Sequence, residues 1–293
     1  MPEIAVSAKT VPPISLRRRM TDRLMTGLAV LTVFLVLAPL IAIFGYLVYR
    51  GVGSISWSFL THMPKPVGEP GGGMANAIVG SVIILAIASI IGVPFGIGAG
   101  IYLAEFGRNR LGSVIRFTAD VLNGVPSIVI GIVGYAIVVL YQKHFSALAG
   151  GVALSIMMVP TICRTTEEML LLVPQALREA AYGLGIPRWR TTLSIVLRTA
   201  TSGVITGIML AFARIAGETA PLLFTTLGNQ FWNVRYDQPT AALPLQIYVY
   251  ANSAYEDWHR QAWAGSFVLI VLIVTSVAAV RYVVRRGSFG GAA

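Results

Sequence analysis

A short polar segment interrupts the long apolar runs of this chain and reads Glu179-Ala180-Ala181-Tyr182-Gly183-Leu184-Gly185. Pro174 stands where a first-turn proline costs no hydrogen bond, and Gly185 stands where a left-handed C-terminal cap is favoured. Pro187 prevents simple continuation, and the basic residues 188–190 follow at once. We therefore expect a helix, a sharp turn and a second short helix. The pattern alone leaves open whether this helix lies on a membrane surface or is bound by another protein.

The composition predicts an integral membrane protein. Hydrophobic residues make up 56% of the 293 residues, charged residues make up 12%, and the mean hydropathy is +0.75. Soluble domains carry about 25% charged residues. The net charge of +10 is concentrated at the ends of apolar runs, so membrane topology explains it better than a nucleic-acid partner does.

No pattern in the chain indicates covalent chemistry. Cys163 is the only cysteine, and the three histidines are scattered without metal-ligand spacing. The sequence contains no phosphate-binding glycine loop and no catalytic triad. We expect no catalytic residue, no cofactor, no metal and no nucleic-acid partner.

Apolar runs predict an all-α bundle of six transmembrane helices, since a span needs about 20 apolar residues. The first run, residues 24–49, is too long and lies too far along the chain for a cleaved signal peptide. The other expected spans cover residues 75–104, 121–141 and 145–163, a fifth that begins near Arg198, and residues 261–280. Pro94 and three nearby glycines in the second span require packing by neighbouring helices.

These spans divide the chain into an anchor, a main domain and two tails. The expected boundaries are an N-terminal tail 1–23, an anchor helix 24–50, a main transmembrane domain 74–286 with a polar loop 164–192, and a C-terminal tail 287–293. When both termini are placed in the cytoplasm, 16 of the 22 Lys and Arg residues fall on the cytoplasmic side and five fall outside. The charge bias thus predicts that both tails and the loop 164–192 are cytoplasmic.

Arg214 is the one basic residue left within the membrane. It follows Arg198 after only 15 uncharged residues, which places it about 24 Å along the fifth helix. Glu218 is four residues further, so on a helix it would share a face with Arg214 and partly neutralise it. A guanidinium suits oxyanions, and a buried charge favours a role in a substrate pathway. The alternative is that Arg214 extends to the outer headgroups.

Arg164, at the cytoplasmic end of the fourth span, is a further candidate. It could relay an anion on the inner side, or it could serve only as a positive-inside anchor. The aromatic-rich outside loop, residues 225–261, could contact a partner protein or pack at the headgroup level.

The polar segment matches a known loop pattern of Glu-Ala-Ala, three residues, Gly, nine residues and Ile-x-Leu-Pro. Glu179-Ala180-Ala181, Gly185, Ile195 and Leu197 match it, whereas Arg198 replaces the usual proline. The chain therefore resembles the membrane permeases of ATP-driven, binding-protein-dependent importers.

Three further segments resemble, more closely, the A-type permease of Pst phosphate importers. They are Ala99-Gly100-Ile101-Tyr102-Leu103-Ala104-Glu105, Gly124-Val125-Pro126-Ser127-Ile128-Val129 and Ala213-Arg214-Ile215-Ala216-Gly217-Glu218-Thr219-Ala220-Pro221-Leu222-Leu223, with Asn229-Gln230-Phe231-Trp232 just beyond the third. The first two look common to both phosphate permeases, and the third is typical of the A subunit.

The resemblance implies the type I ABC importer permease fold and transport of inorganic phosphate across the cytoplasmic (inner) membrane. It implies a heterodimer with a C-type permease, two copies of a cytoplasmic ATPase and a periplasmic phosphate-binding protein. Glu179, Ala180, Ala181 and Gly185 would then couple the permease to the ATPase. One alternative is a permease for another oxyanion such as phosphonate. The other is a self-contained ion-coupled carrier or channel, for which inverted repeats would be expected and none is obvious.

Overall fold

The computed structural model of this chain describes residues 15–66, 69 and 71–289. Residues 1–14 of the expected N-terminal tail and residues 290–293 of the expected C-terminal tail lie outside the described residues. The chain divides into two compact units, Met1–Tyr49 and Arg50–Ala293, which are described separately. The helix α1 (Leu16–Ser54) forms nearly all of the described part of the first unit. It contains the predicted anchor and begins within the segment expected to be a tail, because the Leu, Arg and Met residues there are good helix formers.

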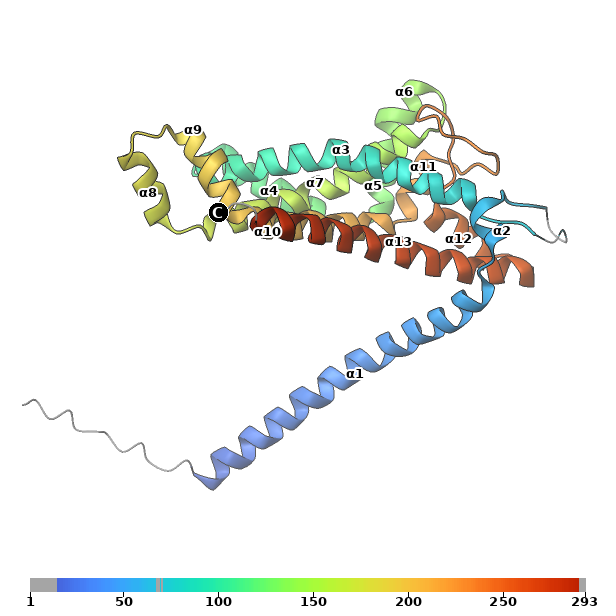
Figure 1. Cartoon of the computed structure of the whole chain (residues 1–293), viewed down its shortest axis with the longest axis horizontal. Coiled ribbons are helices and arrows are strands. Elements are labelled where there is room, and N and C mark those ends of the chain that lie inside the picture. Colours follow the sequence, from blue (N-terminus) through green and yellow to red (C-terminus); the bar gives the residue numbers. More distant parts are fainter. Residues whose placement is uncertain (1–14, 67–68, 70, 290–293) are drawn as a thin grey trace, which may run out of the picture. The chain divides into compact units, whose positions relative to one another are not determined.

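The described part of the second unit consists of helices joined by loops, with one isolated β-bridge. Figure 1 shows its long helices running side by side, with α8 and α9 at one end and α6, α11 and α12 toward the other. Its helices are α2 (Trp57–Thr61), α3 (Ala75–Phe106), α4 (Arg110–Gly124), α5 (Ser127–Gly134), η1 (Tyr135–Val139), α6 (Leu140–Gln142), α7 (Ala147–Leu171), α8 (Gln175–Gly183), α9 (Arg188–Thr191), η2 (Thr192–Val196), α10 (Leu197–Ala216), α11 (Ala220–Thr225), α12 (Leu243–Ala251) and α13 (Glu256–Phe289).

The predicted number of spans is confirmed. Among the described residues, five helices are long and apolar enough to cross a membrane: α1, α3, α7, the continuous helix Arg188–Ala216, and α13. A sixth span is counted when the bent pair Arg110–Gly124 and Ser127–Gln142 is taken as one crossing. The all-α membrane bundle expected from the apolar runs is therefore the observed fold.

The helices α3 and α7 form the centre of the second unit, and glycines let them approach closely. A Cβ added to Gly96 would stand 2.6 Å from the Cβ of Ile162. A Cβ added to Gly92 would stand 3.1 Å from that of Met158. Because these glycines are four residues apart, they share one face of α3. Pro94 lies inside α3 without ending it, and the expected packing by neighbours is confirmed.

The expected third span, residues 121–141, is wrong as a single helix. The chain bends by 108° between α4 and α5, at Val125 and Pro126. Proline has no N–H to donate and disfavours helical geometry in the residue before it, so α4 ends where the Gly-Val-Pro-Ser motif begins. The helix α4 begins at Arg110, before the expected start of the span at residue 121.

The fourth and fifth spans reach further toward each other than predicted. The helix α7 continues through Arg164 to Leu171, and the fifth span begins at Arg188 rather than near Arg198. The charged residues Arg164 and Glu167 can lie within α7 because each is paired with an opposite charge. The loop between the two spans is consequently shorter than residues 164–192.

Candidate functional site

The polar segment folds as predicted into a helix, a turn and a second short helix. The helix α8 ends at Gly183, and Gly185 adopts a left-handed backbone conformation with φ of +75°. The Gly185 N–H donates to the Tyr182 carbonyl at 2.9 Å, and the Ile186 N–H donates to the Ala181 carbonyl at 3.1 Å. These two bonds form the Schellman motif, which favours glycine at this position. Pro174 is the N-cap of α8, one position before the first-turn site expected for it.

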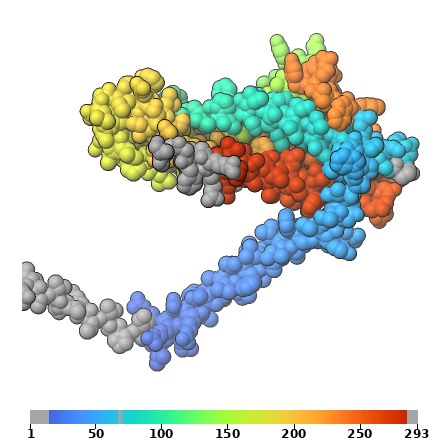
Figure 2. Space-filling view, in the orientation of Figure 1, coloured from blue at the N-terminus to red at the C-terminus, as the bar shows by residue number. Residues whose placement is uncertain are grey.

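The helix α8 has one buried face and one open face. Only Arg178 and Ala181, three residues apart, are buried within it. Glu179 and Ala180 are exposed. Ala181, one of the residues expected to couple to the ATPase, packs instead against this chain itself, since it is 2% exposed. Glu179 and Ala180 remain open to a partner. Figure 2 shows the yellow region that contains α8 projecting at one end of the second unit.

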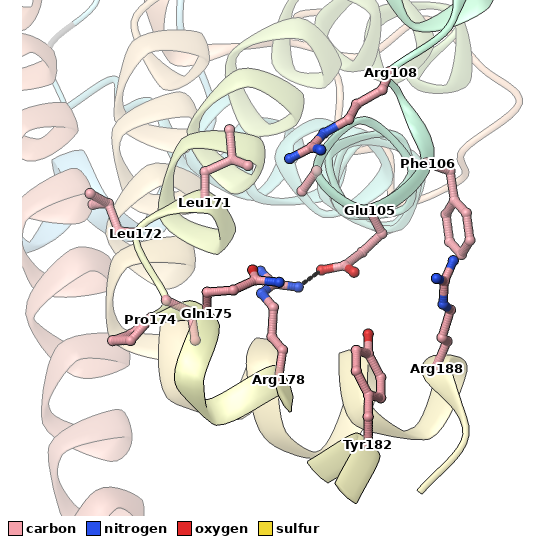
Figure 3. Close-up of a pocket in the computed structure, with 12 residues that line it drawn as sticks. Glu105, Phe106, Arg108, Leu171, Leu172, Pro174, Gln175, Arg178, Tyr182 and Arg188 are labelled. Carbon is pink, nitrogen blue, oxygen red and sulfur yellow. Dashed lines mark hydrogen bonds and ion pairs between the residues drawn. The ribbon is translucent and has the colours of Figure 1, made fainter. Parts of the chain in front are cut away.

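A hollow of about 550 Å³ lies between α8 and the ends of α3 and α7. Figure 3 shows Glu105 at the end of α3 and Arg178 on α8 joined by an ion pair beside this hollow. Arg178 Nη2 also donates to the backbone carbonyl of Leu170 at 2.8 Å. One side chain thus connects α8 to two transmembrane helices. Sequence reasoning missed both charged residues, although Glu105 closes one of the motifs that carried the resemblance.

Arg164 belongs to a cluster of four charged residues between α4 and α7. Its Nη1 donates to Glu167 Oε2 at 2.7 Å, and its Nε lies 3.1 Å from Asp120 Oδ1. Arg116 Nε donates to Glu167 Oε1 at 2.6 Å, so the carboxylate, 3% exposed, bridges two arginines. The cluster carries two charges of each sign. Arg164 is thus already paired with two carboxylates. In the sequence, the only sign of the other three members of the cluster is their position near the ends of predicted spans.

The predicted pairing of Arg214 with Glu218 is wrong. The helix α10 ends at Ala216, so Glu218 lies beyond its last turn and the four-residue spacing no longer places the two side chains on one face. Among the described residues, no ion pair or side-chain hydrogen bond involves Arg214, which is exposed in the isolated chain. Its position in the last turn of α10 favours a cation, because helix carbonyls there carry partial negative charge.

The structure does not bring Arg214 and Arg164 together. Arg214 lies in the turn of α10 nearest α11, whereas Arg164 lies in the part of α7 that leads to α8. Figure 1 shows α8 and α11 toward opposite ends of the second unit. The two arginines therefore lie at different levels of the bundle, since Thr165 beside Arg164 packs against Gly207, about 10 Å before Arg214 along α10.

The aromatic loop divides into packed and exposed parts. The rings of Tyr250 and Trp258 stack with centroids 4.4 Å apart, and Tyr250 is buried. Trp232 and Tyr236 are exposed. Within the described part of the chain, no group of three or more His, Cys, Asp or Glu residues is placed to hold a metal ion.

A family model described as "Binding-protein-dependent transport system inner membrane component" matches residues 96–288. The chain belongs to this family. The match includes α7, α8 and α10, and so covers the polar segment 179–185 together with Glu105, Arg164 and Arg214.

Named relatives of this inner membrane component are permeases. The phosphate transport system permease protein PstA of Yersinia pestis is 47% identical over 92% of both chains. That of Haemophilus influenzae is 43% identical over 88% of this chain and 91% of its own length. PstA 1 of Mycobacterium tuberculosis, strain H37Rv, is 34% identical over 94% of this chain and 92% of its own length.

A solved structure shares the fold of this inner membrane component. A chain of the MetNI methionine ABC transporter, in inward-facing conformations, has a TM-score of 0.56. It is 17% identical, and the match covers 73% of this chain and 94% of that one. The likeness confirms the importer permease fold. Family membership and the membrane-spanning helices make the chain a multi-pass inner membrane protein, and the permease names confirm a transport subunit rather than an enzyme.

Proposed function

We propose that this chain is a membrane-spanning permease subunit of an ATP-driven importer that moves inorganic phosphate across the inner membrane. The observation that carries the proposal is the 47% identity to a PstA phosphate permease over 92% of both chains. A likeness of that extent covers the pathway helices as well as the cytoplasmic loop, and therefore the parts that select the substrate.

The chain would work in a complex with an ATPase and a binding protein. In detail, we expect a heterodimer with a C-type permease, two copies of a cytoplasmic ATPase, a periplasmic phosphate-binding protein, and both termini in the cytoplasm. The open face of α8 supports the ATPase contact, since Glu179 and Ala180 are exposed and uncommitted within the described residues. Gly185 fixes the turn that presents this face.

The pathway residues would act at two levels. Arg214 is exposed and unpaired among the described residues, so its guanidinium is available to an oxyanion on the outer side. Glu218, just past the helix end, would limit how tightly that anion is held. Arg164 would accept an anion only by exchanging it for Asp120, which supports a gated inner position or a structural role.

Uptake by a purified complex tests the proposal directly. The chain would be purified in mild detergent with its copurifying proteins and reconstituted into vesicles with the loaded binding protein. We expect uptake of radiolabelled phosphate that requires ATP and persists when a protonophore is added. Uptake by the chain alone, driven by an ion gradient, would reject the ATP-driven importer in favour of a carrier.

Competition experiments test the substrate. Excess unlabelled phosphate should suppress the uptake, whereas equal concentrations of phosphonate or sulfate should leave it largely unchanged. Stronger competition by a phosphonate would assign the importer to that oxyanion instead.

A further inference from the structure

Arg178 is the main polar attachment of α8 to the transmembrane helices. Its guanidinium pairs through Nη1 with Glu105 at the end of α3 and donates through Nη2 to the Leu170 carbonyl near the end of α7. The two charged side chains are 9% and 11% exposed. The other buried residue of α8 is Ala181, which can make only van der Waals contacts.

Besides these bonds, α8 is joined to α7 by residues 172–174, contacts α9 and η2, and borders an open space. A hollow of about 550 Å³ separates it from the ends of α3 and α7, and Arg178 and Glu105 meet beside that space (Figure 3). A displacement of α8 therefore reaches α3 through this guanidinium, and it reaches α7 through the bond to Leu170 and the link of residues 172–174. A guanidinium suits the task because its planar fork holds two acceptors in fixed directions.

We propose that Arg178 and Glu105 are positioning residues that transmit movement of α8 to α3 and α7, so that their ion pair links ATP hydrolysis to transport. The inference rests on the proposed function, because it assumes that an ATPase docks on the open face of α8. It concerns the opposite face of that helix, and neither residue is assigned contact with the ATPase or with phosphate.

The test is a double-mutant cycle with Glu105→Gln, Arg178→Gln and the double variant, in the reconstituted complex. Each single variant leaves a nearly buried charge without its partner, whereas the double variant leaves none. If the ion pair is purely structural, the double variant should regain both the overall stability of the protein and the wild-type uptake of phosphate per ATP. If the pair transmits movement, the double variant should regain overall stability while uptake per ATP stays low.

The decisive quantity is phosphate taken up per ATP hydrolysed. We expect it to fall about fivefold or more in both single variants and in the double variant, with the ATPase still copurifying. Glu168→Gln is the matched control, because Glu168 is an exposed acid in the last turns of α7 with no ion pair among the described residues. It should keep the wild-type ratio. Wild-type coupling in the double variant would overturn the proposal.

A measurement on the chain alone tests the linkage without the ATPase. In detergent, the amides of residues 175–186 should exchange hydrogen faster in the double variant than in wild type, while those of α10 stay unchanged. Equal exchange in residues 175–186 would overturn the proposal. Failure of the wild-type complex to transport phosphate with ATP would instead count against the proposed function, so the two failures are distinguishable.

Discussion

Gly100 of α3 lies so close to Thr166 of α7 that a Cβ on the glycine would stand 2.5 Å from the threonine Cβ and 2.7 Å from the Cys163 carbonyl oxygen. Contacts this short force the two helices apart, because one of the atoms belongs to the backbone. We expect Gly100→Ala to lower the free energy of unfolding by about 1–3 kcal/mol. Thermal unfolding in detergent would measure this loss.

Gly98 is the matched control on the same helix. A Cβ there would meet no atom within 4 Å, so Gly98→Ala should leave stability unchanged or raise it by up to about 1 kcal/mol through helix propensity. Equal losses at the two positions would show that the close approach of α3 and α7 does not limit stability.

Glu167 should be important for stability because it bridges Arg116 and Arg164 while 3% exposed. Glu167→Gln keeps the shape but leaves both guanidinium groups without their carboxylate, at a cost of about 1–3 kcal/mol. Asp120→Asn should cost less, because Asp120 is 57% exposed and solvent screens its pair with Arg164. The unfolding midpoints of the two variants give the comparison, and a larger loss at Asp120 would contradict it.

Local patterns were sufficient to predict the number of spans and the turn after α8. Uncharged runs of about 20 residues have few alternatives to a membrane helix. The turn was predictable because a helix often ends at a residue with positive φ, and glycine, which has no Cβ, adopts that conformation easily. The bend in the third span was not predicted, although the signal was present. Pro126 after Val125 ends a helix by a rule that does not depend on the rest of the fold.

Pairing between helices could not be predicted from spacing. Glu105 and Arg178 are 73 residues apart and meet only because α3 and α7 end beside α8. The four-residue rule even gave a wrong pair, Arg214 with Glu218, because it assumed that the helix continues past Gly217. Charged residues at span ends find partners that only the packing of the bundle determines.

The turn after α8 provides a test of backbone geometry. Gly185 has φ of +75° and no atom within 4 Å of an added Cβ, so any penalty comes from the backbone alone. Gly185→Ala should cost about 1 kcal/mol in local stability and reduce phosphate uptake per ATP hydrolysed. Gly183→Ala, in helical conformation with equally open space, should do neither. Similar effects of the two substitutions would reject the role assigned to the left-handed turn.

The loop between α11 and α12 contains an ion pair, and the direction of its pH response follows from the pKa of its carboxyl group. Arg235 donates to Asp237 through Nε at 3.0 Å and Nη2 at 2.8 Å, and this bonding holds the pKa of Asp237 below its ordinary value of 3.8. Because the carboxyl pKa is lowered, the pair stabilises the loop at pH values above the ordinary pKa. This stabilisation is lost as the pH falls through the lowered pKa. Carbon NMR of labelled aspartates should show Asp237 titrating below 3.8. In Arg235→Gln the titration should move up toward 3.8, and an unchanged titration would exclude Arg235 as the cause.

Arg214 gives the sharpest test of the substrate pathway. Because no ion pair or side-chain hydrogen bond holds it among the described residues, Arg214→Gln leaves no partner unsatisfied and should assemble normally. We expect phosphate uptake to fall about tenfold or more, since the oxyanion would lose its fixed positive charge. Arg198→Gln is the matched control, because Arg198 is also exposed on α10 but lies in its first turn. Normal uptake in Arg214→Gln would mean that this arginine only reaches for the outer headgroups, whereas a selective loss at Arg214 would place the anion near the end of α10 that leads to α11.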